Sequence, residues 1–331
     1  MWALLGKCAK ERGWTVMTSD VYLQMPIDSA VCISEMVTPY TRLLFKHGIV
    51  PSVILSGESP NVAWDFYRQL ERYTRPYHHA YIFRGAISRV SSAVKAKPFY
   101  WPNALREPYL GPDWDTREYM VMVAGSKGRQ VVSHDKPFNS MRSVAKQALW
   151  SGLKLIDPLF NFEDLYQKRL DAIVYFSNIP GFRLYGTGWD KLDEKSRYYQ
   201  AVKRVGAVPI ADKLTTMINF RYALCLENCV FPGYVTEKIF DCFFSGCIPV
   251  YWGAPDITDF VPRDSFVDAR QFNNFKDIDH FLRKMSIDEA QSYLDSARDF
   301  LASVAFGKFH QDFWVDELIK ILEIEFADNV Q

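Results

Sequence analysis

The sequence predicts an α/β protein with two Rossmann-like domains that face each other across a cleft. The chain has 331 residues, more than a single hydrophobic core usually accommodates. Apolar stretches typical of buried strands alternate with helical stretches, which indicates parallel sheets with right-handed crossovers. The alternation stops once, at a proline-rich segment, and then starts again. We therefore predict an N-terminal domain over residues 1–115, a second domain over 116–305, and a C-terminal helix within 306–331 that packs back on the body.

The first domain begins with a short predicted helix that ends near Gly13. The apolar stretches at 14–18, 52–55 and 80–83 are predicted strands, and residues 62–72 have helical spacing. Strands and helices in this order favour a parallel sheet.

The segment 95–115 contains four prolines and several aromatic residues. Proline lacks a backbone donor and discourages regular elements. This segment is the predicted connector between the two domains, and a rigid loop inside one domain is the alternative.

The second domain repeats the pattern of strands and helices. Its first predicted strand, residues 119–124, leads into a loop that contains Ser126, and residues 162–176 have helical spacing. Further strands are predicted at 182–185, 223–226 and 248–252, and further helices at 288–302 and 313–326. In the last helix, apolar residues such as Trp314 and Leu318 share one face, which predicts packing against the rest of the protein.

Composition and charge exclude several classes of function. The 39 Lys and Arg residues balance the 39 Asp and Glu residues, so no global field attracts nucleic acid or an anionic membrane. The six cysteines lack the spacing of a zinc site. We find no signal peptide after Met1 and no apolar run long enough to cross a bilayer. We therefore expect a cytoplasmic protein or one peripheral to the membrane.

The chemistry is concentrated after the predicted strand 223–226. This strand ends in Glu227 and Asn228, and ligands of open α/β sheets bind at the carboxyl ends of strands. A predicted helix follows, with Thr236 as its N-cap and with Glu237 and Lys238 in its first turn. The amino end of a helix favours a bound anion, and Lys238 adds a positive charge there. The alternative is that both residues are ordinary solvated charges.

Three motifs in this region carry a family resemblance. They are Leu226-Glu227-Asn228, Tyr234-Val-Thr-Glu-Lys-Ile-Phe-Asp241 and Ile248-Pro-Val-Tyr-Trp-Gly-Ala-Pro255. Together they closely resemble the signature of the alpha-1,3/1,4-fucosyltransferases, glycosyltransferase family 10. The resemblance implies a GT-B fold, GDP-fucose as the donor, and inversion at the anomeric carbon. It also implies an oligosaccharide or glycoconjugate acceptor, and no obligatory metal or other cofactor.

The resemblance also implies roles for individual residues. Glu237 and Lys238 match the residues that bind the ribose and the diphosphate, and Tyr234 and Asn228 match positions that line the donor site. Arg169, in the helical stretch 162–176, resembles the arginine that grips the diphosphate; the alternative is a surface arginine.

One carboxylate must take the proton from the acceptor hydroxyl. Glu58 follows a predicted strand, and its Glu-Ser-Pro sequence resembles the segment that holds the catalytic glutamate in animal members of the family. Arg84 and Ser126 are candidates for contact with the acceptor or the donor. The sequence departs from the family between Ser126 and Arg169, where an extended insert lies.

Three alternative functions are also compatible with the sequence. The first is a transferase of the same fold that uses another nucleotide sugar, and the second is a catalytically inactive carbohydrate-binding protein. The third is a metal-dependent enzyme centred on Asp113 and Asp115, whose Asp-Trp-Asp sequence we interpret as a chance match because it lies in the proline-rich connector.

Overall fold

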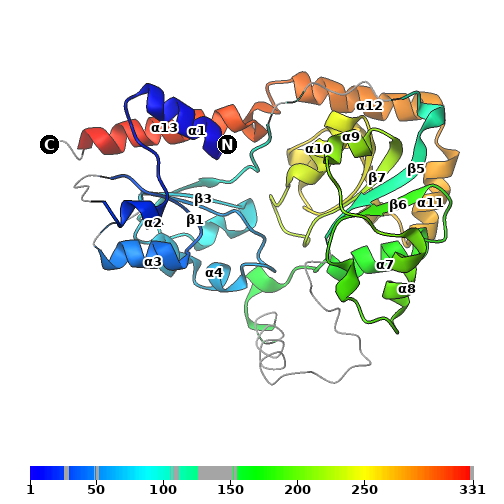
Figure 1. Cartoon of the computed structure of the whole chain (residues 1–331), viewed down its shortest axis with the longest axis horizontal. Coiled ribbons are helices and arrows are strands. Elements are labelled where there is room, and N and C mark those ends of the chain that lie inside the picture. Colours follow the sequence, from blue (N-terminus) through cyan, green and yellow to red (C-terminus); the bar gives the residue numbers. More distant parts are fainter. Residues whose placement is uncertain are drawn as a thin grey trace. The chain divides into compact units, whose positions relative to one another are not determined.

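The chain divides into two compact units, each built on its own parallel sheet (Figure 1). The first unit consists of Met1–Leu105, Pro232–Tyr234 and Val304–Gln331, and the second of Arg106–Phe231 and Val235–Ser303. Two α/β units in series confirm the predicted Rossmann-like fold class. The computed structural model describes residues 1–25, 30–47, 49, 52–104, 106, 112–125, 152 and 155–328.

The sheet of the first unit has the strand order β1-β2-β3-β4, with every neighbouring pair parallel. Its strands are β1 (Ile33–Glu35), β2 (Val53–Leu55), β3 (His79–Ile82) and β4 (Lys95–Pro98). Its α-helices are α1 (Trp2–Glu11), α2 (Ser19–Tyr22), α3 (Pro39–Lys46), α4 (Trp64–Arg68), α5 (Leu70–Thr74) and α13 (Gln311–Asp328). All three side chains of β2 are buried, which explains why this short strand is recognisable in the sequence.

One predicted element of this unit is wrong, and another is correct only in part. Residues 14–18 form no strand, because Val16 is 55% exposed and Trp14 packs instead against Phe326 of α13, with ring centroids 5.0 Å apart. The predicted helix 62–72 is interrupted at Gln69, whose φ of −112° and ψ of 27° separate α4 from α5.

The predicted connector also needs correction at its beginning. Residues Lys95–Pro98 are the strand β4, which pairs with β3 at the edge of the sheet. An edge strand tolerates proline, because one of its sides makes no ladder hydrogen bonds. Farther along, the Asn103 amide donates to the Phe309 carbonyl over 2.7 Å, which ties this segment to the C-terminal part of the unit.

The sheet of the second unit has the order β6-β5-β7-β8-β9, again with parallel neighbours. Its strands are β5 (Glu118–Val123), β6 (Phe182–Tyr185), β7 (Phe220–Leu226), β8 (Ile248–Trp252) and β9 (Val267–Asp268). Its α-helices are α7 (Tyr166–Phe176), α8 (Arg197–Val205), α9 (Lys213–Met217), α10 (Glu237–Ser245), α11 (Phe275–Lys284) and α12 (Ile287–Ala302). The strands predicted at 119–124, 182–185, 223–226 and 248–252 are confirmed as β5, β6, β7 and β8.

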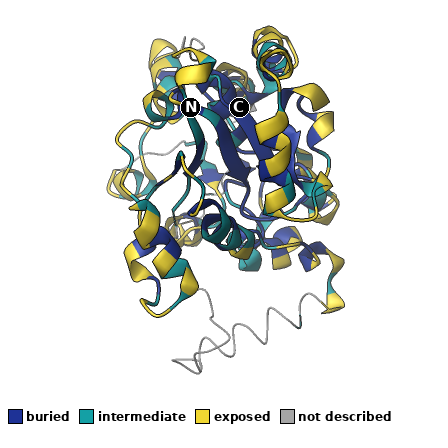
Figure 2. Ribbon diagram, turned by 90° about the vertical axis from the view of Figure 1, so that its right-hand side faces the viewer, coloured by how far each residue is buried: buried dark blue, intermediate teal, exposed yellow. Residues whose placement is uncertain are grey.

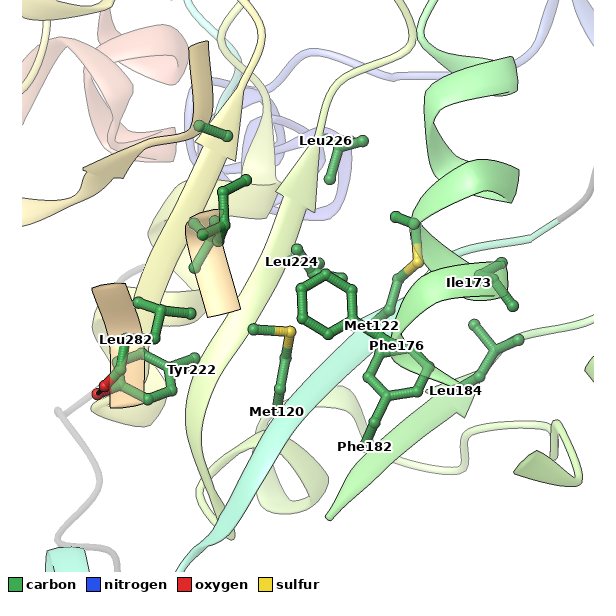
Figure 3. Packing of buried hydrophobic residues seen from close by; sticks show 14 of the residues in the cluster. Met120, Met122, Ile173, Phe176, Phe182, Leu184, Tyr222, Leu224, Leu226 and Leu282 are labelled. Atoms are coloured by element: carbon green, nitrogen blue, oxygen red, sulfur yellow. Dashed lines mark hydrogen bonds between the residues drawn. The ribbon is translucent and has the colours of Figure 1, made fainter. Parts of the chain in front are cut away.

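Buried side chains from the sheet and from α7 form the core of the second unit. Figure 3 shows Met120 and Met122 of β5 beside Leu224 of β7, with Ile173 and Phe176 of α7 packed nearby. In Figure 2 the central strands are mostly dark blue, and the yellow exposed residues lie largely on the helices and loops around them. Strand β7 is buried and lies at the centre of the sheet, and its carboxyl end leads into Glu227 and Asn228.

The last helix, α13, completes the first unit. Trp314 and Leu318 are fully buried, as the predicted apolar face requires. Figure 1 shows α13 (red) beside α1 (blue), and Arg12 bonds Glu323 across this pair over 3.0 Å. Two of its acidic residues also face protein rather than solvent. The Tyr81 hydroxyl donates to Glu317 over 2.7 Å, and His78 Nδ1 lies 2.7 Å from Glu325 Oε1. Within the described residues, no helix is both long and apolar enough to span a bilayer.

We expect the first unit to lose stability as the pH falls below neutrality. Burial alone would raise the pKa of Glu325, but His78 and Ser52 outweigh it and lower the pKa. Burial, with Lys95, lowers the pKa of His79. Both groups therefore contribute stability above their unfolded pKa values, and this stability is lost as the pH falls, first near 6.5 for the histidine and then below about 4.5 for the glutamate.

Urea unfolding at a series of pH values, followed by tryptophan fluorescence, measures this loss. In Glu325→Gln the free energy of unfolding at pH 7 should fall by about 1.5 to 3 kcal/mol, the usual contribution of a hydrogen bond to a charged group. The slope below pH 5 should become shallower. A variant with the wild-type slope would show that Glu325 does not carry the effect.

Candidate functional site

A buried arginine of helix α7 binds the carboxyl end of β7. Arg169 of α7 is 4% exposed, and its Nη2 donates to the Leu226 carbonyl over 2.8 Å and to Asn228 Oδ1 over 2.9 Å. The guanidinium carbon lies 4.8 Å from the ring centroid of Tyr166. Its Nε is buried and has no hydrogen-bond partner among the residues that the structure describes. The alternative of a surface arginine is therefore wrong, and one buried N–H is available to a ligand.

The neighbouring residue, Glu227, is fully buried and is the centre of a second set of contacts. Its carboxylate accepts hydrogen bonds from the Thr236 amide over 2.9 Å and from the Thr236 hydroxyl over 2.9 and 3.0 Å. It also accepts one from Lys238 Nζ over 3.0 Å. Thr236 is the N-cap of α10, as predicted, but its hydroxyl binds Glu227 and does not cap the helix.

Helix α10 begins at Glu237 and stops at Gly246, whose left-handed backbone gives the predicted C-terminal end. Glu237 Oε1 lies 3.6 Å from Lys238 Nζ and 4.0 Å from Lys213 Nζ. Lys213, the first residue of α9, also pairs with Asp241 Oδ2 over 2.6 Å. We call Lys213, Glu227, Glu237, Lys238 and Asp241 the α10 charge cluster.

Electrostatics in the α10 charge cluster keep Glu237 ionised. Burial alone would raise the pKa of Glu237, but the charges of Lys238 and Lys213 outweigh it and lower the pKa to about 2. Lys213 shows the same balance of effects with the opposite sign. Burial alone would lower its pKa, but the charges of Asp241 and Glu237 outweigh burial and raise the pKa. Burial raises the pKa of Asp241 despite the opposing charge of Lys213.

These contacts define what the site can bind. The Glu237 side chain is 37% exposed and ionised, so it can accept hydrogen bonds from a pair of hydroxyl groups. The Lys238 ammonium is 21% exposed at the amino end of α10, where the helix dipole also favours an anion. The site therefore suits a ligand that carries hydroxyl groups next to a negatively charged group.

Four residues predicted from the sequence lie together at this edge of the second sheet: Arg169, Asn228, Glu237 and Lys238. The sequence reasoning missed Glu227, Lys213 and Asp241. Asp241 had a signal, because it lies four residues after Glu237 and so on the same face of the helix. Glu227 stands at the end of a predicted strand and in the first motif, but the sequence suggests no role for it. Lys213 had no local signal, since α9 precedes β7 in the chain.

Two other predicted contacts, Tyr234 and Arg84, belong to the first unit. Tyr234 is 2% exposed, and its ring meets Phe83 edge-on with centroids 5.0 Å apart. The Gly85 amide donates to the Pro232 carbonyl over 3.0 Å, so the loop 232–234 is fixed beside the end of β3. Arg84 is exposed, and its backbone lies against Gly233. A donor-site role for Tyr234 and a substrate contact for Arg84 stay predictions.

The predicted base, Glu58, lies just after the carboxyl end of β2 in the first unit. Its side chain is partly exposed, and its carbonyl accepts a hydrogen bond from the Tyr67 hydroxyl over 2.9 Å. A second carboxylate, Glu35, stands close by at the end of β1 and lies against Gly57. Burial and the charge of Glu58 raise the pKa of Glu35. The role of Glu58 as base stays a prediction, and Glu35 was not found from the sequence.

Three predicted candidates remain: Ser126, Asp113 and Asp115. Ser126 lies outside the described residues. Asp113 and Asp115 are both exposed, at the start of a short 3₁₀ turn (Trp114–Thr116). In the described part of the chain, no three His, Cys, Asp or Glu residues are grouped so that they could hold a metal ion.

Part of the chain is similar in sequence to known proteins. Residues 191–302 match the family model described as glycosyltransferase family 10 (fucosyltransferase), C-terminal. The chain is 38% identical over 106 residues to the alpha-(1,3)-fucosyltransferase FucT of Helicobacter pylori. The aligned stretch covers 31% of this chain and 22% of that protein. It is 33% identical over 72 residues to an alpha-(1,4)-fucosyltransferase of Arabidopsis thaliana, covering 22% and 18%. The match thus spans about a fifth of the length of these curated relatives.

Solved structures are similar over more of the chain. Alr3699/HepE of Anabaena, solved in complex with UDP-glucose, aligns with 86% of this chain and 74% of its own at 12% identity and a TM-score of 0.51. This likeness shows the fold alone. An alpha1,3-fucosyltransferase solved with GDP aligns with 92% of this chain and 80% of its own, at 17% identity and a TM-score of 0.48.

Proposed function

We propose that this chain, which matches the C-terminal model of glycosyltransferase family 10 (fucosyltransferase) over residues 191–302, is an inverting fucosyltransferase. It moves fucose from GDP-fucose to a hydroxyl group of an oligosaccharide or glycoconjugate, with an alpha-1,3 or alpha-1,4 linkage. The family match over residues 191–302 supports the reaction class. The names of the relatives, an alpha-(1,3)- and an alpha-(1,4)-fucosyltransferase, support fucose as the transferred sugar and support the linkage.

One observation carries the proposal: the tripeptide Leu226-Glu227-Asn228 organises two cations at the end of β7. Arg169 binds the Leu226 carbonyl and the Asn228 side chain, while Lys238 binds the Glu227 carboxylate. In the reaction a diphosphate leaves the sugar and gains negative charge. Cations that are already held in place stabilise such charge without reorganisation. The buried Nε of Arg169, which has no hydrogen-bond partner in the described part of the chain, offers one further donor.

The remaining residues take the other roles of the transfer. Glu237, ionised at neutral pH, accepts hydrogen bonds from the ribose hydroxyls. Glu58 takes the proton from the acceptor hydroxyl, whose oxygen forms the new bond to the anomeric carbon. The bond between that carbon and the β-phosphate oxygen breaks, and GDP leaves with the electron pair. We propose that this chemistry requires no bound metal, because Arg169 and Lys238 supply positive charge to the leaving group.

The assignment of the nucleotide needs a direct test, because the same fold holds UDP-glucose in the Anabaena protein. Purified protein is incubated with a panel of GDP- and UDP-sugars and with mixed glycan acceptors, and released nucleotide is measured with and without EDTA. We expect release from GDP-fucose that depends on the acceptor and persists in EDTA. Activity with a UDP-sugar alone would assign a different transferase, and loss of activity in EDTA would refute the metal-free mechanism. Absence of release from every donor, with carbohydrate binding retained, would indicate an inactive binding protein.

A further inference from the structure

We infer that Lys213 is a positioning residue of the donor site, which orients the Glu237 carboxylate toward the ribose hydroxyls by binding Glu237 and Asp241 together. This inference rests on the proposed function, since it names how that same site holds its nucleotide. Lys213 comes from α9, a different element from the α10 motif that it supports.

The geometry places one ammonium group over two carboxylates of the same helix face. Lys213 Nζ lies 2.6 Å from Asp241 Oδ2 and 4.0 Å from Glu237 Oε1. Glu237 and Asp241 are four residues apart, so their side chains are neighbours on α10, and two like charges at this spacing repel each other. Lys213 is 27% exposed and Asp241 19% exposed, so solvent screens this repulsion only in part.

Lys238 cannot replace Lys213 in this role. Its ammonium already binds the fully buried Glu227 over 3.0 Å and is 3.6 Å from Glu237. A buried carboxylate needs that partner, because an unpaired charge in the interior is costly. When a diphosphate binds, Lys238 is shared among still more negative charges. Lys213 is then the cation that keeps Glu237 compensated, and it leaves Lys238 for the phosphate.

Lys213 also has the surroundings of a fixed group. Lys213 and Lys238 line the same small cavity, together with Cys225 of β7 and Cys242 of α10. The ion pair with Asp241 is held from the first turn of α9, whose N-cap Asp212 accepts a hydrogen bond from Thr215 over 2.8 Å. A lysine held at both ends loses little entropy when the nucleotide binds.

The test measures nucleotide binding by calorimetry for the wild type, Lys213→Met, Lys213→Arg and the matched control Lys203→Met, an exposed lysine of α8. The probes are GDP and 2′-deoxy-GDP, which lacks one of the hydroxyls assigned to Glu237. We expect Lys213→Met to weaken GDP binding by about tenfold or more, and Lys213→Arg and Lys203→Met to remain within about threefold of the wild type. The loss in Lys213→Met should be smaller for 2′-deoxy-GDP, because the disturbed contact is partly absent there.

A double variant separates positioning from a general effect on folding. Lys213→Met combined with Asp241→Asn removes the repulsion between Asp241 and Glu237 but does not restore a cation beside Glu237, so it should recover part of the GDP affinity. If Lys213→Met alone does not fold, GDP binding is measured with the double variant instead. Equal losses for GDP and 2′-deoxy-GDP, or GDP binding by Lys213→Met within about threefold of the wild type, would overturn the inference while the proposed function stands. A wild-type protein that does not bind GDP would overturn both.

Discussion

Replacement of Glu58 by Gln is expected to lower the turnover of fucosyl transfer by about 10²- to 10⁴-fold, the usual contribution of a general base. The amide keeps the size of the side chain but cannot take the acceptor proton at neutral pH. The backbone of Glu58 is fixed by the Tyr67 hydroxyl at 2.9 Å, so the substitution should leave the loop in place. The proposed GDP-binding residues lie on other elements, so GDP affinity should stay unchanged. Steady-state kinetics and calorimetry measure the two quantities separately.

Glu35→Gln is the matched control, because Glu35 is the neighbouring carboxylate at the end of β1. Turnover in this variant should remain within about threefold of the wild type, as for most substitutions outside the reacting groups. If Glu35→Gln abolishes turnover and Glu58→Gln does not, the base is Glu35. Wild-type turnover in both variants would remove the first-unit carboxylates from the mechanism.

Gly233→Ala is expected to destabilise the first unit by about 2 to 4 kcal/mol and to reduce transfer activity strongly. The backbone of Gly233 has a φ of +75°, which side chains of L residues rarely adopt. An added Cβ would lie 2.7 Å from Arg84 Cβ and 2.9 Å from the Arg84 backbone nitrogen. Because backbone atoms cannot move aside cheaply, the loop 232–234 would have to shift. Thr236 and the start of α10 follow directly, so the donor site should be disturbed too.

Gly13→Ala separates the cost of the positive φ from the cost of the contact with Arg84. Gly13 has the same φ of +75°, but nothing lies within 4 Å of the position of an added Cβ. This variant should therefore lose only the backbone contribution, about 1 kcal/mol. Thermal unfolding and nucleotide release compare the pair. Equal destabilisation of both variants would show that the contact with Arg84 has no energetic role.

The sequence predicted the parts of the fold whose burial is visible in the residue pattern. Strands β7 and β8 are apolar along most of their length because both faces are covered, and each was placed correctly within a few residues. The strand β1 has three residues with only one buried, so no pattern reveals it. The sequence at the start of α3 does indicate a helix, because Thr38 and Thr41 form a capping box around Pro39.

The site was predictable where its chemistry lies in one stretch of chain. Glu237, Lys238 and Asn228 share a continuous motif, and Arg169 was found through the family resemblance. The resemblance did not reveal that Lys238 binds Glu227. This pairing arises because β7 ends inside the protein, so that Glu227 is buried. Lys213 reaches the site only through the packing of α9 against α10. No spacing in the sequence encodes that contact.

The composition of the first unit from three separate stretches of chain has a consequence for biosynthesis. Domains generally fold in order as the ribosome releases them, the N-terminal domain first. Here α13, with the fully buried Trp314, is translated after the whole of the second unit. On the nascent chain, β1 to β4 therefore wait without their last helix while β5 to β9 emerge and can close. The second unit can therefore close before the first is complete, and the surface that α13 covers stays exposed until α13 emerges.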